Sequence, residues 1–394
     1  MDPAINHDMC ASIFNAVGVY MLLDVNSPLP GQSLNRGDPG STYNSDYLSR
    51  IFGVVEAFKD YPNTLGFFGG NEVINDNPSG GVVPPYLRAV TRDLKNYIAK
   101  HATRAIPVGY SAADVRDILV DTWEYLQCAV GGNSNDASRI DFFGLNSYSW
   151  CGGSATYQSS GYDVLVSDFS NTTVPVFFSE YGCNKVQPRT FTEVQTLYGT
   201  QMTSVMSGGL VYEYSQEVSN YGLVILNANG TASLRADYDN LQAQYNKLNV
   251  TLLQSGNSTA TTLKPPTCKS NLITSSSFNN TFTVPALPSG AQALIDNGIN
   301  KPNRGKLVTV NQDNVQSTVY GSNGNVIQGL AIKPLPNDQS NTPNGQDTSG
   351  SASGSSTSTA PAPTATKKGA AVREDVSKLA LLAGLLGGLL WNLS

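Results

Sequence analysis

Six short apolar runs recur along the chain before residue 215. Each has the length of a strand and is apolar almost throughout, rather than alternating with polar residues. Continuous apolarity is typical of strands that are buried on both faces of a parallel sheet. The predicted strands cover residues 18–25, 64–70, 105–109, 140–146, 174–179 and 208–214.

Segments with the apolar spacing of amphipathic helices lie between these runs. The predicted helices cover residues 7–17, 47–61, 86–100, 191–206 and 237–248. The first of them leads directly into the first predicted strand. An alternation of strands and helices at this scale predicts an α/β fold, either a doubly wound sheet or a barrel.

Polar residues near the ends of the predicted strands favour the barrel. They lie at or just beyond the carboxyl end of a strand, where a (β/α)8 barrel has its catalytic rim. These residues are Asp24, Glu72, Asp114, Asn146, Glu180 and Glu213. A complete barrel has eight strands, so we expect a (β/α)8 TIM barrel that lacks its first two strands in this chain.

The residue pattern of the sequence changes after about residue 250. We predict a catalytic barrel over 1–250 and a small accessory β segment over 251–335, with β-like pieces at 280–287 and 305–311. Residues 336–368 are rich in Ser, Thr, Pro and Gly, a composition that predicts a disordered stalk.

The last residues have the order of a GPI-attachment signal, which we place at 369–394. Small residues begin at Gly369, a polar spacer covers 372–378, and an apolar tail covers 379–394. A tail-anchor helix is the alternative, but the apolar run is short for a membrane span and no basic cluster follows it. No signal peptide opens the chain, so we expect an N-terminally truncated form of a secreted protein.

Composition and charge limit the classes of function that the chain can have. Charged residues make up 14% of the chain and its formal net charge is −6, which argues against nucleic acid as a partner. Only two histidines are present, His7 and His101, and neither neighbourhood suggests a catalytic triad or a zinc site. We expect no metal and no cofactor. Five cysteines are an odd number, which leaves one of them unpaired in an oxidising compartment.

Glu72 and Glu180 each end an apolar, aromatic strand, in "FFGGNE" and "VPVFFSE". A lone glutamate in this position is more often a loop cap or an ion-pair partner. Two in the same context could meet across a barrel mouth. Retaining glycoside chemistry needs two carboxyls about 5–5.5 Å apart, one as the nucleophile and the other as general acid and then base.

Several motifs together resemble one known family. They are "GNE", "FFSEYGCN", "IPVGYSAAD", "NSYSWCG" and "SGGLVYEYS". The chain resembles the fungal cell-wall β-1,3-glucanosyltransferases of glycoside hydrolase family 72, the Gas and Gel proteins of clan A, from residue 2 to about 250. Clan A enzymes carry the acid/base on strand four and the nucleophile on strand seven. Glu72 and Glu180 end the second and fifth predicted strands of this chain. If two strands are absent before them, these become strands four and seven of the barrel.

The resemblance implies roles for individual residues. Glu72 looks like the acid/base and Glu180 like the nucleophile. Asn71 would bind a sugar 2-hydroxyl, and Tyr148 would hydrogen-bond to the nucleophile. Tyr212 matches a contact to the donor sugar. Further candidate substrate contacts are Asp24, Ser33, Asn35, Arg36, Asp114 and Arg116, of which Asp114 resembles an acceptor-side contact.

The resemblance also implies how the cysteines pair. It implies a disulfide between Cys128 and Cys268, which would tie the accessory segment to the barrel, and another between Cys151 and Cys183. Cys10 resembles half of a bridge whose partner lies upstream.

These observations lead to one hypothesis and two alternatives. The hypothesis is a GPI-anchored, monomeric β-1,3-glucanosyltransferase at the cell surface. Its partners would be β-1,3-glucan donor and acceptor chains. The alternatives are an endo-β-1,3-glucanase and, because two strands are absent, an inactive glucan-binding wall protein.

Overall fold

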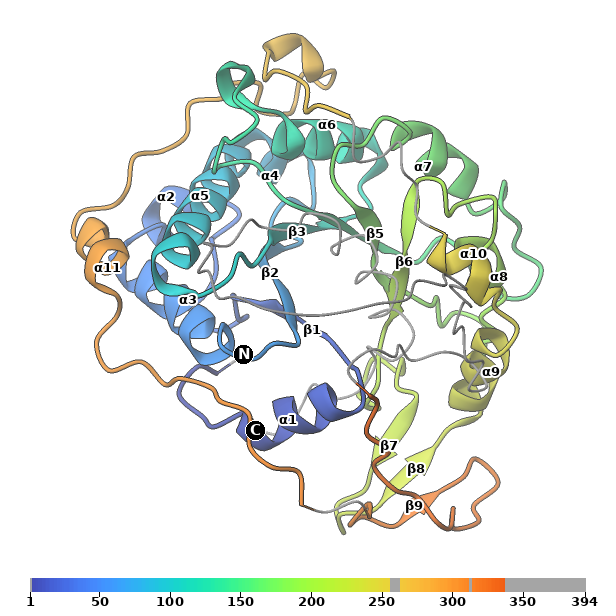
Figure 1. Cartoon of the computed structure of the whole chain (residues 1–394). Helices are drawn as coiled ribbons and strands as arrows, with labels where there is room; N and C mark the ends of the chain where they lie inside the picture. The colour runs from blue at the N-terminus through green and yellow to red at the C-terminus, as the bar shows by residue number, and fades with distance from the viewer. Residues whose placement is uncertain (1, 256–262, 312–313, 337–394) are drawn as a thin grey trace, which may run out of the picture.

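Six parallel strands form one curled sheet, and helices cover its outer side (Figure 1). The computed structural model describes residues 2–255, 263–311 and 314–336. The six strands are β1 Met21–Asp24, β2 Thr64–Asn71, β3 Val108–Ala113, β4 Phe143–Ser147, β5 Val176–Tyr181 and β6 Met206–Val211. They adjoin in chain order, so that β1 and β6 are the two edges. The predicted α/β barrel fold is confirmed as a six-stranded part of a barrel.

The helices follow the strands in alternation, as the sequence pattern predicts. The α-helices are α1 Asp8–Ala16, α2 Pro39–Thr42, α3 Ser45–Phe58, α4 Asn77–Val82, α5 Pro84–His101, α6 Arg116–Gln127, α7 Tyr162–Asp168, α8 Glu193–Leu197, α9 Ala236–Tyr245, α10 Val250–Gln254 and α11 Ala291–Asn297. α3 begins after Asn44, whose side chain accepts a hydrogen bond from the Tyr47 backbone N–H. This is an N-cap, which satisfies a donor that the first turn leaves free.

Two predicted elements differ most from the structure in their bounds. The strand expected at 105–109 is β3, Val108–Ala113, because the strand continues through small and polar residues that its apolar run does not include. The helix expected at 191–206 is wrong beyond its first turns, since α8 ends at Leu197. Gly199 follows, which disfavours a helix, and the Tyr198 hydroxyl is tied to the backbone of Gly209. α6 and α7 are helices that the periodicity did not indicate.

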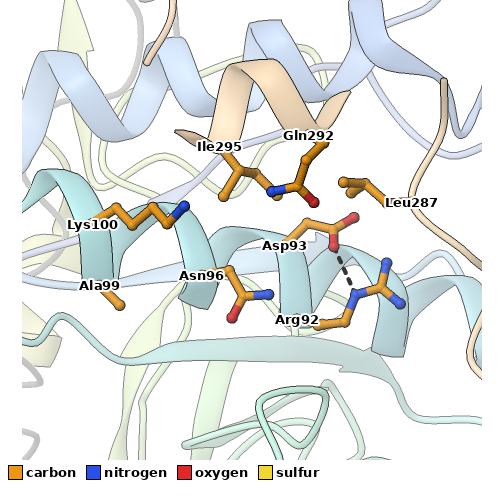
Figure 2. Close-up of a pocket in the computed structure, with 8 residues that line it drawn as sticks. All are labelled: Arg92, Asp93, Asn96, Ala99, Lys100, Leu287, Gln292 and Ile295. Atoms are coloured by element: carbon orange, nitrogen blue, oxygen red, sulfur yellow. Dashed lines mark hydrogen bonds and ion pairs between the residues drawn. The ribbon is translucent and has the colours of Figure 1, made fainter. Parts of the chain in front are cut away.

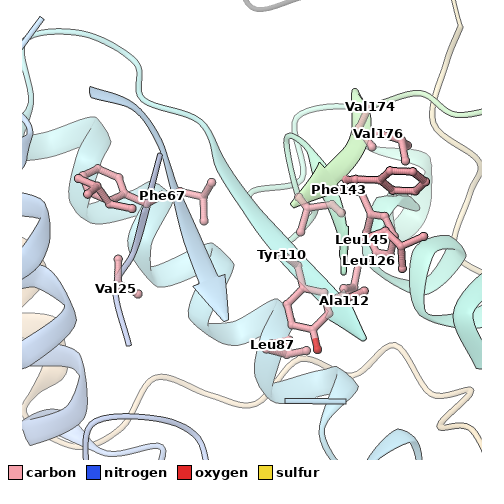
Figure 3. Packing of buried hydrophobic residues seen from close by; sticks show 14 of the residues in the cluster. Val25, Phe67, Leu87, Tyr110, Ala112, Leu126, Phe143, Leu145, Val174 and Val176 are labelled. Carbon is pink, nitrogen blue, oxygen red and sulfur yellow. The ribbon is translucent and has the colours of Figure 1, made fainter. Parts of the chain in front are cut away.

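Apolar side chains fill both sides of the sheet. Between the strands and the outer helices lies a continuous core, part of which Figure 3 shows around Phe67, Tyr110 and Phe143. A smaller cluster holds Phe68, Phe142 and Phe177, with Leu22 from β1 and Leu210 from β6 against it. Side chains from both edges of the sheet can meet these rings only on the concave side. The cluster therefore fills the interior of the curl below the carboxyl ends of the strands.

Residues 263–311, here called the strap, run along the outer side of the helices (Figure 1). Side chains of the helices hold its backbone at successive points. Asp121 of α6 accepts hydrogen bonds from the backbone N–H groups of Thr274 and Ser275, both at 2.8 Å. The Tyr125 hydroxyl donates to the Thr281 carbonyl at 2.6 Å. The strap is thus fixed to the barrel by side-chain to backbone bonds, and also by Phe278, Ala291 and Ile295, which are buried in the core.

The predicted accessory β segment is largely wrong in its secondary structure. The pieces at 280–287 and 305–311 belong to no strand of the described chain. Their backbone groups bond to side chains, as when the Val308 N–H donates to the Ser12 hydroxyl. The segment does contribute one short strand, β9 Val319–Tyr320, which forms a small sheet with β7 Val224–Leu226 and β8 Ala232–Leu234.

The stalk from residue 337 onward and the GPI signal with Gly369 lie outside the described residues. Within the described part of the chain, no helix is both long and apolar enough to cross a membrane.

Candidate active site

Both strands that carry the candidate carboxylates contain one extra residue just before the carboxylate. Along β2 the pairing with β3 moves from Phe68 to Asn71, three residues, while β3 advances two. Along β5 the pairing with β4 moves from Phe177 to Glu180, again three residues against two. Residues three apart in a regular strand point to opposite faces. Each bulge therefore places the residue that follows it, Asn71 in β2 and Glu180 in β5, on the same face of the sheet as Phe68 and Phe177.

Glu72 lies directly after β2 in a left-handed backbone conformation, with φ of 49°. This conformation is uncommon for a residue with a side chain and costs about 1–3 kcal/mol. Its backbone N–H donates to the Ser111 carbonyl at 2.8 Å, and its Oε1 accepts from Asn146 Nδ2 at 2.9 Å. A guanidinium N–H of Arg36 donates to its carbonyl at 3.4 Å. The surroundings therefore hold both the backbone and the carboxyl of Glu72.

Glu180 is the half-buried carboxylate at the end of β5. The Tyr148 hydroxyl donates to its Oε2 at 2.5 Å. Burial raises the pKa of Glu180 to about 7; the Tyr148 hydrogen bond lowers it, while the negative charges of Glu72 and Glu213 raise it further. Asn146 pairs with Glu180 in the sheet and its Nδ2 donates to Glu72 Oε1, so both carboxyls lie next to Asn146. Glu180 is mostly ionised, and so can act as a nucleophile, only above about pH 7.

Three tyrosine rings stand together beside Glu180. Tyr148 makes edge contacts with Tyr212 and Tyr221, at centroid distances of 6.2 and 5.4 Å, and the latter two rings are 5.2 Å apart. Arg189 donates to the backbone carbonyls of Tyr212, at 2.7 Å, and of Tyr221. Such a set of rings suits the faces of a sugar. Sequence reasoning missed Tyr221, since it follows β6 in a loop with no periodic signal.

Asp114 and Arg116, just after β3, form an ion pair with Nε and Oδ1 2.5 Å apart. The Ser147 hydroxyl also donates to Asp114 Oδ2 at 3.0 Å, which links this pair to the end of β4. Both residues therefore lie at the carboxyl end of the sheet, although Arg116 is itself the first residue of α6.

The other candidate contacts come from β1 and the loop that follows it. Asp24 ends β1, accepts from both nitrogens of Asn26, and has a pKa that burial raises to about 6. Asn35 turns its Oδ1 back to the N–H of Gly37, at 2.9 Å, and so shapes its own loop. Arg36 reaches Glu72, as described above. Ser33 is half-buried in the same loop.

Two disulfides join the pairs that the family resemblance implied. Cys151 and Cys183 link the loops after β4 and β5. Cys128 and Cys268, 140 residues apart, link the end of α6 to the strap. Cys10 is exposed and is the one free cysteine among the described residues.

A cavity of about 330 Å³ lies away from this site, between α5 and α11. Figure 2 shows its lining, with Arg92 paired to Asp93. The lining contains none of the residues at the carboxyl ends of the strands, so we do not assign it to the candidate chemistry. In the part of the chain that the structure describes, no three His, Cys, Asp or Glu side chains group to hold a metal ion.

Known proteins are similar to this chain over most of its length. The sequence model of a family described as Glucanosyltransferase matches residues 1–249. The 1,3-beta-glucanosyltransferase gel2 of Aspergillus fumigatus is 57% identical over 351 residues, which are 89% of this chain and 72% of that protein. The probable 1,3-beta-glucanosyltransferase GAS3 of Saccharomyces cerevisiae is 50% identical over 319 residues, 78% of this chain and 60% of that protein.

Solved structures of a related yeast protein are similar in fold. Gas2 of Saccharomyces cerevisiae in complex with a compound superposes with a TM-score of 0.65 at 35% identity, over 74% of this chain and 63% of that chain. A Gas2 mutant in complex with laminaritetraose and laminaripentaose gives a TM-score of 0.64 at 35% identity, over 74% of this chain and 62% of that chain. The chain therefore spans less than two thirds of GAS3 and Gas2.

Proposed function

Because the chain belongs to the glucanosyltransferase family, we propose that it is a retaining 1,3-β-glucanosyltransferase. It cleaves a β-1,3-glucan internally and transfers the new reducing end to another glucan. The observation that carries the proposal is the pair of carboxyls, Glu72 directly after β2 and Glu180 at the end of β5, both of them next to Asn146. Retaining glycoside chemistry requires such a pair.

In the first step Glu180 attacks the anomeric carbon of the bound donor. A bond forms between its carboxylate oxygen and that carbon, while the glycosidic carbon–oxygen bond breaks. The electron pair of the broken bond goes to the departing oxygen, and Glu72 gives that oxygen its proton. The Tyr148 hydroxyl stabilises the ionised form of Glu180 before attack, since it donates to Oε2.

In the second step the non-reducing end of another glucan replaces the departed chain. Glu72, now ionised, takes the proton of the acceptor hydroxyl, and that oxygen attacks the anomeric carbon. The ester to Glu180 breaks, and the new glycosidic bond has the configuration of the old one. Transfer exceeds hydrolysis when a sugar occupies the acceptor side more often than water. The rings of Tyr148, Tyr212 and Tyr221 favour sugar binding beside the carboxyls.

The length of the products tests this function. The full chain is incubated with a reduced laminari-oligosaccharide, and the products are separated by length. Transfer gives products longer than the substrate. Shorter products alone would instead indicate the endo-β-1,3-glucanase. Binding of the oligosaccharide without formation of any new product would indicate the glucan-binding wall protein.

We also propose that the chain acts as a monomer at the cell surface, held in the outer leaflet by a GPI anchor at Gly369. The order of small residues, polar spacer and apolar tail in 369–394 supports this. Residues 336–394 fused behind a secreted reporter should place it on the cell surface. Phosphatidylinositol-specific phospholipase C should then release the reporter, whereas a tail-anchor helix would hold it in the membrane after the same treatment.

A further inference from the structure

A buried polar cluster lies directly beneath the two carboxyls, on strands β3, β4 and β5. Its members are Ser111, Asn146 and Ser179, which are 2%, 3% and 8% exposed. Buried polar groups in an apolar interior are costly unless they are hydrogen-bonded. Their presence here, above the ring cluster of Phe68, Phe142 and Phe177, therefore needs a physical reason.

The two serine hydroxyls fix the orientation of the Asn146 amide. Both lie close to Asn146 Oδ1, Ser111 Oγ at 3.0 Å and Ser179 Oγ at 2.8 Å, and the two hydroxyls are 2.8 Å apart. Two protons are available for these three contacts. Every arrangement that fills two of them gives Asn146 Oδ1 at least one proton. In this orientation the amide oxygen faces the serines, and the amide nitrogen faces the rim, where an ionised carboxylate can only accept.

The Asn146 amide nitrogen divides its two protons between two residues of the rim. One is donated to Glu72 Oε1, at 2.9 Å, and the other to Asn71 Oδ1, at 3.1 Å. An amide NH2 group donates and does not accept. When Glu72 carries a proton, that proton cannot be donated to Asn146, and it is favoured on Oε2 because Oε1 then remains the stronger, carbonyl-type acceptor for the amide. Asn71 is likewise held with its oxygen towards Asn146, which turns its own NH2 group elsewhere.

We propose that Asn146, held by Ser111 and Ser179, is a positioning residue that keeps the acidic proton of Glu72 on Oε2, the oxygen that Asn146 does not contact. The inference rests on the proposed function, because it concerns the proton that leaves Glu72 in the first step. It adds a function for three residues that neither contact the anomeric carbon nor exchange a proton with the substrate.

Two substrates with different leaving groups separate this role from a structural one. A laminari-oligosaccharide needs its departing oxygen protonated, whereas an aryl β-laminarioside that releases dinitrophenolate does not. The first-turnover release of dinitrophenolate reports attack by Glu180 alone. In the full chain, Asn146→Ala should lower oligosaccharide cleavage by about 10- to 100-fold, a part of the usual contribution of a general acid. The burst of dinitrophenolate should stay within about threefold of wild type.

Two further variants serve as comparisons. The double variant Ser111→Ala, Ser179→Ala frees the amide to turn over and should show the same pattern as Asn146→Ala, while either single variant should show much less. Asn63 is a matched control, since it is 3% exposed and its Nδ2 donates to two backbone carbonyls, of Ala11 and Val19, far from the rim. Asn63→Ala should lower the melting temperature without changing the ratio of the two rates.

The outcomes are distinguishable. Selective loss of oligosaccharide cleavage in Asn146→Ala supports the inference. An equal loss on both substrates, or no loss on either, overturns it while leaving the proposed function in place. If the wild-type chain cleaves neither substrate, the proposed function fails and this inference fails with it.

Discussion

The rim at the ends of β2 and β5 and the strap at 263–311 are both held by hydrogen bonds, but the bonds differ in kind. At the rim they join side chains whose positions follow from the register of parallel strands, as with Asn146, which pairs with Glu180 in the sheet and donates to Glu72. In the strap they join helix side chains to backbone groups of a segment with little regular structure of its own, as with Asp121.

The difference indicates that the rim contributes mainly to the chemistry and the strap mainly to stability. The rim must hold a few atoms at fixed separations, and each of its strands is buried among neighbours that allow little movement. The strap covers the helices α5 and α6 and reaches α1, so its contribution is expected in stability rather than in chemistry. Changes at the rim should therefore alter rate, and changes in the strap should alter unfolding.

The largest effect is expected at the rim. Glu72→Gln keeps the size of the side chain and its contact with Asn146 but removes the proton that the departing oxygen needs. Transfer from a laminari-oligosaccharide should fall by about 10²–10⁴-fold, the usual contribution of a general acid. Product analysis by length measures the fall. Unchanged transfer would remove Glu72 from the reaction.

Breaking the disulfide of the strap should give the largest change in stability. Replacing Cys128 and Cys268 with Ala opens a loop of 140 residues and should lower the free energy of unfolding by about 2–5 kcal/mol. Urea unfolding and limited proteolysis of the strap are the measurements. The matched control replaces Cys151 and Cys183, beside the site. It should affect transfer more and unfolding less, and the reverse result would contradict the division between rim and strap.

A single strap contact should have a smaller effect of the same type. Asp121→Ala leaves the backbone N–H groups of Thr274 and Ser275 without their acceptor. This should cost about 1–3 kcal/mol of stability, measured by urea unfolding, with transfer unchanged. A clear loss of transfer at equal protein concentration would show that the strap supports the chemistry after all.

The smallest expected effect is a shift in pH dependence. The pKa of Glu180, about 7, is raised by burial and lowered by the Tyr148 hydroxyl. Transfer should thus fall as pH drops below about 7, because Glu180 becomes protonated. Tyr148→Phe removes the lowering hydrogen bond, so this fall should move to higher pH by about one unit. Rates measured from pH 5 to 9 test it; an unmoved profile would contradict the role of the hydroxyl.

The same pKa has a consequence for stability with a definite sign. The ordinary pKa of a glutamate is 4.5, and that of folded Glu180 is higher. The folded protein therefore keeps a proton that the unfolded chain loses. The stabilisation is fully present below about pH 4.5 and is lost as pH rises through about 7. Replacing Glu180 with Gln should accordingly stabilise the fold above pH 7.

Sequence reasoning identified the barrel strands because each is apolar over several residues and ends in a polar group. The strap has no such periodicity, and the β-like pieces predicted at 280–287 and 305–311 form no strand there. Its contacts depend on single side chains such as Asp121 and Tyr125, which become meaningful only when helix and strap are adjacent. Ser111 and Ser179 were missed for a related reason: in sequence they are small polar residues within apolar strands.

The bulges in β2 and β5 have a consequence for anyone who alters this protein. A substitution changes one side chain, but a deletion between Phe177 and Glu180 would shift the alternation of the strand by one step. Glu180 would then point at the helices, with every atom of the reaction still present in the chain. At these two strand ends the number of residues is as much a part of the catalyst as their identity.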